Sequence, residues 1–222
     1  MHRVHHVPSL RAAVITTDTN ANATHPSLIK VQQVCEDCNS GWMSGLEDAA
    51  KPLFVDLSEH SRAEFSGQES RLLACWAVKT AIMFEFNDVQ SRVFSEAQLR
   101  DLYVARRIPR QTQVFAGLYD GDSGSRLLHQ HSTVHRLTDS GSAAEVIGHT
   151  AEIGIALGRA AFLVRTIVPA NLGPVSDYYS PTPMAPWSQI WPNTPDRTLL
   201  MSPAMDDQLF TDAIVGMRSD LT

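Results

Sequence analysis

The first half of the chain carries hydrophobic residues at helical spacing. Over residues 71–86 the apolar side chains are distributed almost all round a helix, which predicts a helix buried at the centre of the fold. Ser95 is a suitable N-cap for a second helix that ends at about residue 107. One face of this second helix is apolar and carries Leu99, Leu102 and Tyr103.

After Pro109 the hydrophobic period changes to two, which is typical of strands. Four such stretches, divided by turns rich in Gly, Ser and Asp, cover residues 112–119, 126–137, 145–157 and 161–168. They predict an antiparallel meander packed against the two helices. The proline-rich stretch 169–203 is expected to wrap the sheet, with one strand-like segment at 187–192. Residues 206–217 are expected to close the chain as a short helix.

Composition agrees with an α+β fold, which we expect in two parts, residues 1–57 and 58–222. Of the 222 residues 43% are hydrophobic and 19% are charged, as in an ordinary globular protein. There is no apolar run of bilayer length and no signal-peptide pattern, so no membrane partner is expected. Three cysteines, two of them close together, favour a reducing cytoplasm. With a net charge of −6, DNA binding would need a local basic patch.

Cys35 and Cys38 lie three positions apart, before all of these elements. Two thiols at this spacing can hold one edge of a tetrahedral Zn²⁺. The turn between them frees backbone N–H groups to hydrogen-bond the thiolates. Ser44 and Glu47 match a capping box, so a helix is expected to begin there and to be interrupted at Pro52. Short strands are expected before the cysteines, at residues 10–16 and 31–34, and would complete a small ββα unit.

A lone Cys-x₂-Cys is half of a zinc signature, and two interpretations stay open. In the first, zinc is bound and histidines complete the site, the candidates being His2, His6 and His25. In the second, the cysteines are a relic knuckle that is held by the packing of Trp42 and Leu46.

The motif Cys-x₂-Cys-Asn-x-Gly-Trp-Met-Ser-x-Leu-Glu begins at Cys35 and is followed by Ala-Lys-Pro-Leu at residues 50–53. It resembles the second half of the motif in the HNH-endonuclease-like proteins of actinobacteria and their phages. Residues 76–85 resemble the helix that follows in that family, and residues 189–192 its closing strand. The resemblance runs from about Lys30 to the C-terminus. It implies metal-dependent hydrolysis of DNA phosphodiesters, with Mg²⁺ or Mn²⁺ as the catalytic cation.

The resemblance also implies site residues. An HNH site needs a histidine base, a metal that stabilises charge on the phosphate, and an asparagine that orients the histidine-bearing loop. His6 is the candidate base and Asn39 the candidate orienter. The string at residues 5–8 departs from the family's acid-His-Val-x-Pro, and there is no room upstream of it for the family's first cysteine pair. The chain is therefore expected to be N-terminally short relative to the family.

A further departure concerns the catalytic metal. Many HNH motifs carry a histidine where this chain has Met43, and a thioether is a poor ligand for Mg²⁺, which takes oxygen. We therefore expect weak DNA cleavage or none. A basic cluster near the end of the second helix is interpreted either as a phosphate-binding surface or as a solvated helix end. It consists of Arg100, Arg106, Arg107 and Arg110.

Other polar residues lie inside apolar segments. Lys79 and Glu85 interrupt the helix at 71–86, and a buried lysine is costly unless paired, so Lys79 either reaches the surface or serves a site. Cys75 is interpreted as a small core residue. Three histidines share one face of the strand 126–137, where a solvent-facing strand is favoured over a metal site. They are His129, His131 and His135.

Three functions follow from these patterns. The leading hypothesis is an HNH-endonuclease-like protein that hydrolyses DNA. The second is a catalytically degenerate zinc-knuckle module that binds nucleic acid or protein. The third is a phage or host accessory protein whose helix-and-sheet part carries the function.

Overall fold

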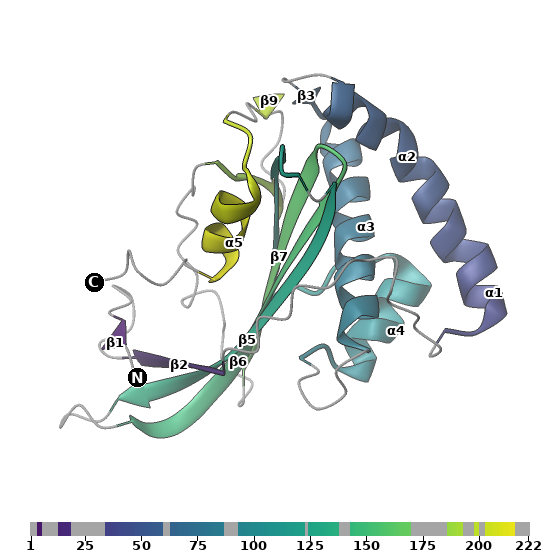
Figure 1. The fold of residues 1–222 in the computed structure, drawn as a ribbon. Coiled ribbons are helices and arrows are strands. Elements are labelled where there is room, and N and C mark those ends of the chain that lie inside the picture. The colour runs from purple at the N-terminus through teal and green to yellow at the C-terminus, as the bar shows by residue number, and fades with distance from the viewer. Residues whose placement is uncertain are drawn as a thin grey trace.

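The computed structural model describes residues 4–5, 13–18, 34–59, 63–86, 93–122, 124–137, 143–169, 186–192, 198–199 and 203–215. In these ranges helices cover both faces of an antiparallel sheet, and the predicted α+β class is confirmed (Figure 1). No helix of the described part is both long enough and apolar enough to cross a membrane.

The sheet has seven strands in the order β1-β2-β5-β6-β7-β4-β8, with every neighbouring pair antiparallel. These strands are β1 (Val4–His5), β2 (Ala13–Asp18), β4 (Thr112–Leu118), β5 (Ser125–Leu137), β6 (Ala143–Leu157), β7 (Ala160–Pro169) and β8 (Ser188–Trp191). The four strands predicted after Pro109 are confirmed to within two residues. The meander is β5-β6-β7, and β4 pairs with the far side of β7 rather than with β5. A second sheet pairs β3 (Ala63–Glu64) with β9 (Thr198–Leu199).

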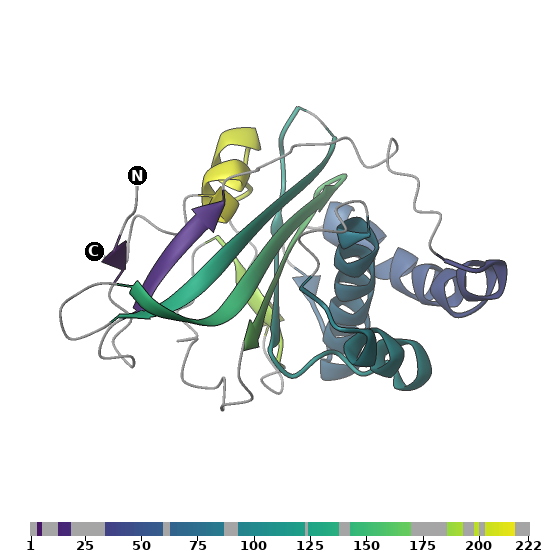
Figure 2. The same ribbon diagram turned by 90° about the horizontal axis from the view of Figure 1, so that it is seen from below.

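Two long helices lie on one face of the sheet, α2 (Ser44–Glu59) and α3 (Gly67–Glu85), with α4 (Glu96–Ala105) beside them (Figure 2). The apolar side chains of this face form one core with the helices, in which Trp76 is 7% and Ile82 is 2% exposed. The predicted central helix is confirmed. It begins a turn early because Ser66 caps it in a capping box with Glu69. Ser95 caps α4 in the same way, as predicted.

The helix predicted at Ser44 is α2, which begins there, but Ser44 does not cap it, because its backbone is already helical at φ −61° and ψ −45°. Before α2 come a short turn, α1 (Glu36–Cys38), and a π-helical turn, η2 (Asn39–Met43), with a kink at Gly41. The sulfur of Cys35 caps α1. The predicted interruption at Pro52 is also wrong, because α2 runs through it to Glu59. The proline is exposed, and burial of neighbouring Leu53 and Leu57 outweighs the lost hydrogen bond.

The strands expected to build a separate ββα unit lie elsewhere. Strand β2 covers most of the predicted strand at 10–16, but it pairs with β5 at the edge of the large sheet. Residues 31–33 of the second predicted strand lie outside the described residues, and Val34 forms a bend. The first predicted part of the chain thus shares a sheet with the second, and α2 shares the core with α3.

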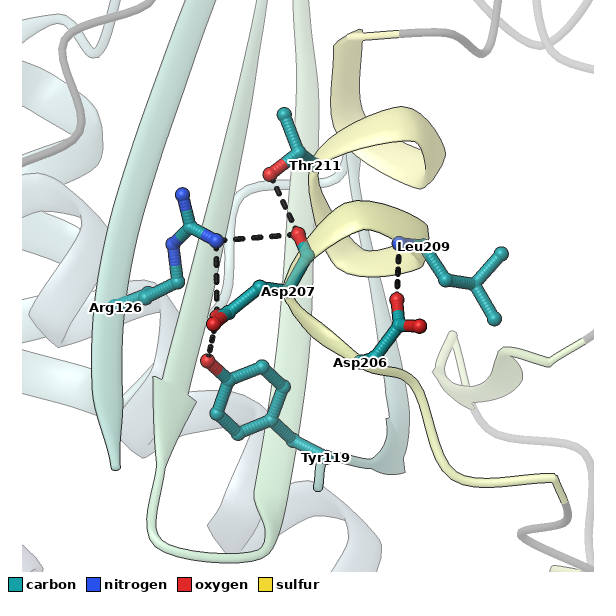
Figure 3. A network of polar contacts seen from close by, with 6 residues as sticks. All are labelled: Tyr119, Arg126, Asp206, Asp207, Leu209 and Thr211. Carbon is teal, nitrogen blue, oxygen red and sulfur yellow. Dashed lines mark hydrogen bonds and ion pairs between the residues drawn. The ribbon is translucent and has the colours of Figure 1, made fainter. Parts of the chain in front are cut away.

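The opposite face of the sheet is covered by α5 (Asp207–Val215), which confirms the predicted closing helix. Its start is fixed by a polar network (Figure 3). The hydroxyl of buried Tyr119 donates to the carboxylate of Asp207, which lies 2.9 Å from a guanidinium nitrogen of Arg126. Arg126 and Thr211 also donate to the Asp207 carbonyl, at 3.1 and 2.7 Å. Asp206 caps the helix by accepting the Leu209 N–H at 2.7 Å.

Candidate functional site

The two cysteines of the knuckle lie at the start of a helix. Cys35 is exposed, has extended backbone angles of φ −66° and ψ 156°, and is the N-cap of α1. Its sulfur accepts the backbone N–H of Cys38 at 3.3 Å, and its carbonyl accepts from Cys38 and Asn39. The predicted N–H···S contact is therefore confirmed. A thiolate at this place is favoured by the backbone N–H groups that have no helical partner.

The side chains of the two cysteines interact, and their pKa values move apart. The pKa of Cys35 is lowered because its sulfur accepts hydrogen bonds from the Cys38 thiol and backbone. The pKa of Cys38 is raised, chiefly because its thiol donates to Cys35. The pair therefore forms its first thiolate at Cys35 and shares the remaining proton. Metal binding would release that proton, since zinc ligands are thiolates.

The described residues bring no third candidate metal ligand to the two thiols. No group of three or more His, Cys, Asp and Glu side chains gathers anywhere in the described ranges. The donor set of two thiolates suits zinc and would leave two positions for other ligands. The predicted ligands His2, His6 and His25, and with them the candidate base, lie outside the described residues.

Two motif residues after the cysteines, Asn39 and Met43, differ in their exposure to solvent. Asn39, the predicted orienter, is exposed on η2, four residues before buried Met43 and one after Cys38. Met43 is 5% exposed, so its side chain belongs to the interior. The position that many HNH motifs use for a metal ligand is therefore part of the packing here.

Trp42 connects the knuckle to α4. The guanidinium carbon of Arg106 lies 4.4 Å from the centroid of the Trp42 ring. The Tyr103 ring stands 6.0 Å from it at an interplanar angle of 60°. Trp42 also packs against the large core, in which Leu46 is 8% exposed. Trp42 and Leu46 thus anchor the segment after the cysteines to the core, and this accommodates either interpretation of the metal.

Arg106 has an uncommon backbone conformation. It ends α4 with φ 51° and ψ 36°, the left-handed region in which a helix end usually has glycine. The backbone N–H groups of Arg106 and Arg107 bond to the carbonyls of Leu102 and Asp101. Such a conformation costs about 1–2 kcal/mol for a residue with a side chain, and it persists where surrounding contacts fix it. The stack on Trp42 is one such contact.

The four predicted phosphate-binding arginines are not equivalent. Arg100 and Arg110 are exposed. Arg107 pairs with Asp101 at 3.4 Å, in a contact whose side chains are 63% and 57% exposed and which is therefore weak. Arg106 is partly buried against Trp42. The structure thus leaves Arg100, Arg107 and Arg110 accessible to a polyanion.

Lys79 has a partner on the motif helix. Its ammonium lies 2.6 Å from a carboxylate oxygen of Glu47, with the two side chains 6% and 55% exposed. The buried lysine thus reaches a surface carboxylate and ties α3 to α2. Glu85, also buried, accepts the N–H groups of Val93 and Phe94 at 3.3 Å each. Both buried charged residues of α3 therefore hold neighbouring segments in place.

The histidine strand is not solvent-facing along its length. His129 is 7% exposed and stands edge to face against Phe84 at 5.1 Å. The prediction is wrong for this residue because α3 covers this face of β5. His131 follows at 5.0 Å, and the side chain of His135 lies outside the described residues. Cys75 is a buried core residue as predicted, and burial raises its pKa.

Sequence analysis missed a polar row on the opposite face of the sheet. Across neighbouring strands, Gln130 is paired in register with Glu152, Glu152 with Arg165, and Arg165 with Gln113. Arg165 donates to Glu152 at 2.8 Å, and both side chains are largely buried. Opposite charges in two otherwise apolar strands were the signal in the sequence. Their buried pairing makes this row a structural feature of the sheet.

No family model, no curated protein and no solved structure matches the chain.

Proposed function

We propose that this chain is an HNH-endonuclease-like protein that acts on DNA, with Cys35 and Cys38 as half of a structural zinc site. The observation that supports this best is the exposed dithiol at a helix start, where a backbone N–H donates to Cys35. This is the arrangement that a thiolate ligand needs, and it lies on the part of the chain that carries the family motif.

Zinc, when bound, would fix the knuckle relative to the segment that supplies the remaining ligands. Cys35 and Cys38 would hold it as thiolates. The candidate ligands on the N-terminal segment are His2, His6 and His25. Zinc binding would therefore bring that segment to the motif helix, which is where the family's catalytic histidine is needed.

The catalytic assignment rests on the family resemblance. His6 would take the proton from the attacking water, and Asn39 would orient the loop that carries it. Mg²⁺ or Mn²⁺ would stabilise charge on the scissile phosphate. We expect weak activity because Met43 is buried where the family often has a ligand, and groups of a catalytic unit act together.

DNA would be held through its phosphates by the arginines of α4 and the turn after it. Arg100, Arg107 and Arg110 are exposed and free of strong ion pairs in the described ranges. The proposal places the protein in a reducing cytoplasm, since its three cysteines are free thiols.

The second candidate is the degenerate binding module, in which the knuckle stabilises a surface for nucleic acid or protein. The burial of Met43 favours it. It keeps the zinc half-site and the basic surface and omits hydrolysis.

Zinc content and plasmid cleavage together test the proposal. We expect about one zinc per chain in the wild type and loss of zinc in Cys35→Ser and Cys38→Ser, whereas Cys75→Ser keeps it. Cleavage of supercoiled plasmid in Mn²⁺ should be weak, abolished by EDTA and absent in His6→Ala. Zinc that remains in both knuckle variants would contradict the metal assignment. Cleavage that survives His6→Ala would show that another residue is the base, and zinc with no cleavage would favour the binding module.

A further inference from the structure

One face of α4 presents an aromatic ring beside an arginine. Tyr103 is 49% exposed and follows the exposed Arg100 by three residues, so the two side chains are neighbours on the helix surface. Val104, which is 69% exposed, extends the same surface. An exposed tyrosine ring offers a face on which another ring can stack.

The Tyr103 ring is held in position from behind. Trp42 stands against it at 6.0 Å, and the guanidinium of Arg106 covers the Trp42 ring at 4.4 Å. The left-handed backbone of Arg106 turns its side chain back toward the knuckle. Tyr103 therefore contacts Trp42 and is still 49% exposed. A side chain that already packs against a neighbour has less rotamer freedom to lose when a ligand stacks on it.

We propose that this surface, made of Arg100 and Tyr103, binds single-stranded DNA, with a base stacked on Tyr103 and a phosphate beside Arg100. The inference rests on the proposed action on DNA and specifies the form of the substrate. Arg106 is a positioning residue that holds Trp42 and Tyr103 and does not contact phosphate.

The chemistry of the surface favours a single strand over a duplex. A duplex presents phosphates to arginine, but its base faces are stacked inside and cannot meet Tyr103. A single strand offers both groups, and aromatic stacking tolerates every base because each has a π face. The exposed arginines of α4 and of the turn after it supply the positive charge that a polyanion requires, although the chain carries a net charge of −6.

The test measures binding by fluorescence anisotropy, with zinc-loaded protein and without added Mg²⁺ or Mn²⁺, so that cleavage does not interfere. The probes are a labelled single strand of about 15 nucleotides and the duplex of the same sequence. The single strand should bind more tightly than the duplex. Tyr103→Ala should weaken single-strand binding by about 5- to 100-fold, and Tyr103→Phe should preserve it. Leu209→Ala is the matched control, since it shortens an exposed side chain of α5 on the opposite face of the sheet and should leave affinity unchanged.

Salt dependence separates the two roles of arginine. Arg100→Gln should lower the slope of log affinity against log salt by about 0.7, because one phosphate contact is lost. Arg106→Gly relieves the left-handed backbone while it removes the stack on Trp42. It should weaken binding with the slope unchanged.

Two results would overturn the inference alone: a duplex that binds as tightly as the single strand, or a Tyr103→Ala variant that binds like the wild type while its thermal melting is unchanged. Absence of binding to either probe would overturn the action on DNA as well. A reduced slope of log affinity against log salt in Arg106→Gly would show that Arg106 contacts a phosphate, which contradicts its positioning role.

Discussion

The ion pair between Lys79 and Glu47 gives an asymmetric prediction for stability. The side chain of Lys79 is 6% exposed, and that of Glu47, whose carboxylate lies 2.6 Å from the ammonium, is 55% exposed. Glu47→Gln leaves a buried cation without its counter-charge. Breaking a fully buried ion pair costs about 3–5 kcal/mol. The loss should be smaller here, because the carboxylate of Glu47 is partly in contact with water and its attraction to Lys79 is screened. We therefore expect Glu47→Gln to lower the free energy of unfolding by about 1–3 kcal/mol.

Lys79→Met should behave differently, because it removes the buried charge together with its need for a partner. Replacing a buried ion by an apolar side chain of similar volume is often close to neutral, so we expect a change within about 1 kcal/mol. The double variant should then resemble Lys79→Met, with the cost of Glu47→Gln largely abolished. Urea unfolding of the four proteins at constant pH measures this cycle. Equal and additive losses in the two single variants would refute the pairing as the reason for the burial of Lys79.

Two further predictions concern the knuckle and the sheet. In the metal-free protein, iodoacetamide should alkylate Cys35 first, and the rate should rise with pH to a midpoint below that of an ordinary thiol, because the pKa of Cys35 is lowered; Cys75 should react only after unfolding. Peptide mapping checks the order, and early labelling of Cys75 would contradict its burial. Gly154→Ala should destabilise by about 1–3 kcal/mol, because its new Cβ would lie 1.9 Å from Ile214. Gly45→Ala, where nothing lies within 4 Å, should be neutral or stabilising in the same melting experiment.

Local rules predicted the strands and most helix ends well. The alternating segments after Pro109 are bounded by turn residues, and Ser95 satisfies its own capping box, so both follow from nearby sequence. The position of β4 does not. Strand β4 pairs with the edge of the meander at which its apolar residues are buried, which is β7. That choice depends on contacts between residues far apart in the chain.

Sequence patterns described the candidate site less completely. The spacing of Cys35 and Cys38 predicted the N–H···S contact, but sulfur is not among the usual helix caps, so the short turn α1 that Cys35 caps was not predicted. Nor did the spacing indicate that Arg106 turns back onto Trp42, because this needs a left-handed residue that is rarely arginine. The burial of His129 was missed because it depends on Phe84 of α3, which is distant in sequence.

X-ray absorption at the zinc edge of the purified chain tests the central claim most directly. If Cys35 and Cys38 are half of a zinc site, the spectrum should contain two sulfur ligands at about 2.3 Å, with nitrogen or oxygen ligands at about 2.0–2.2 Å. Cys38→Ser, which should lose its zinc, should give no zinc-edge signal above background. A zinc spectrum without sulfur, or a protein that binds no zinc at all, would contradict the account.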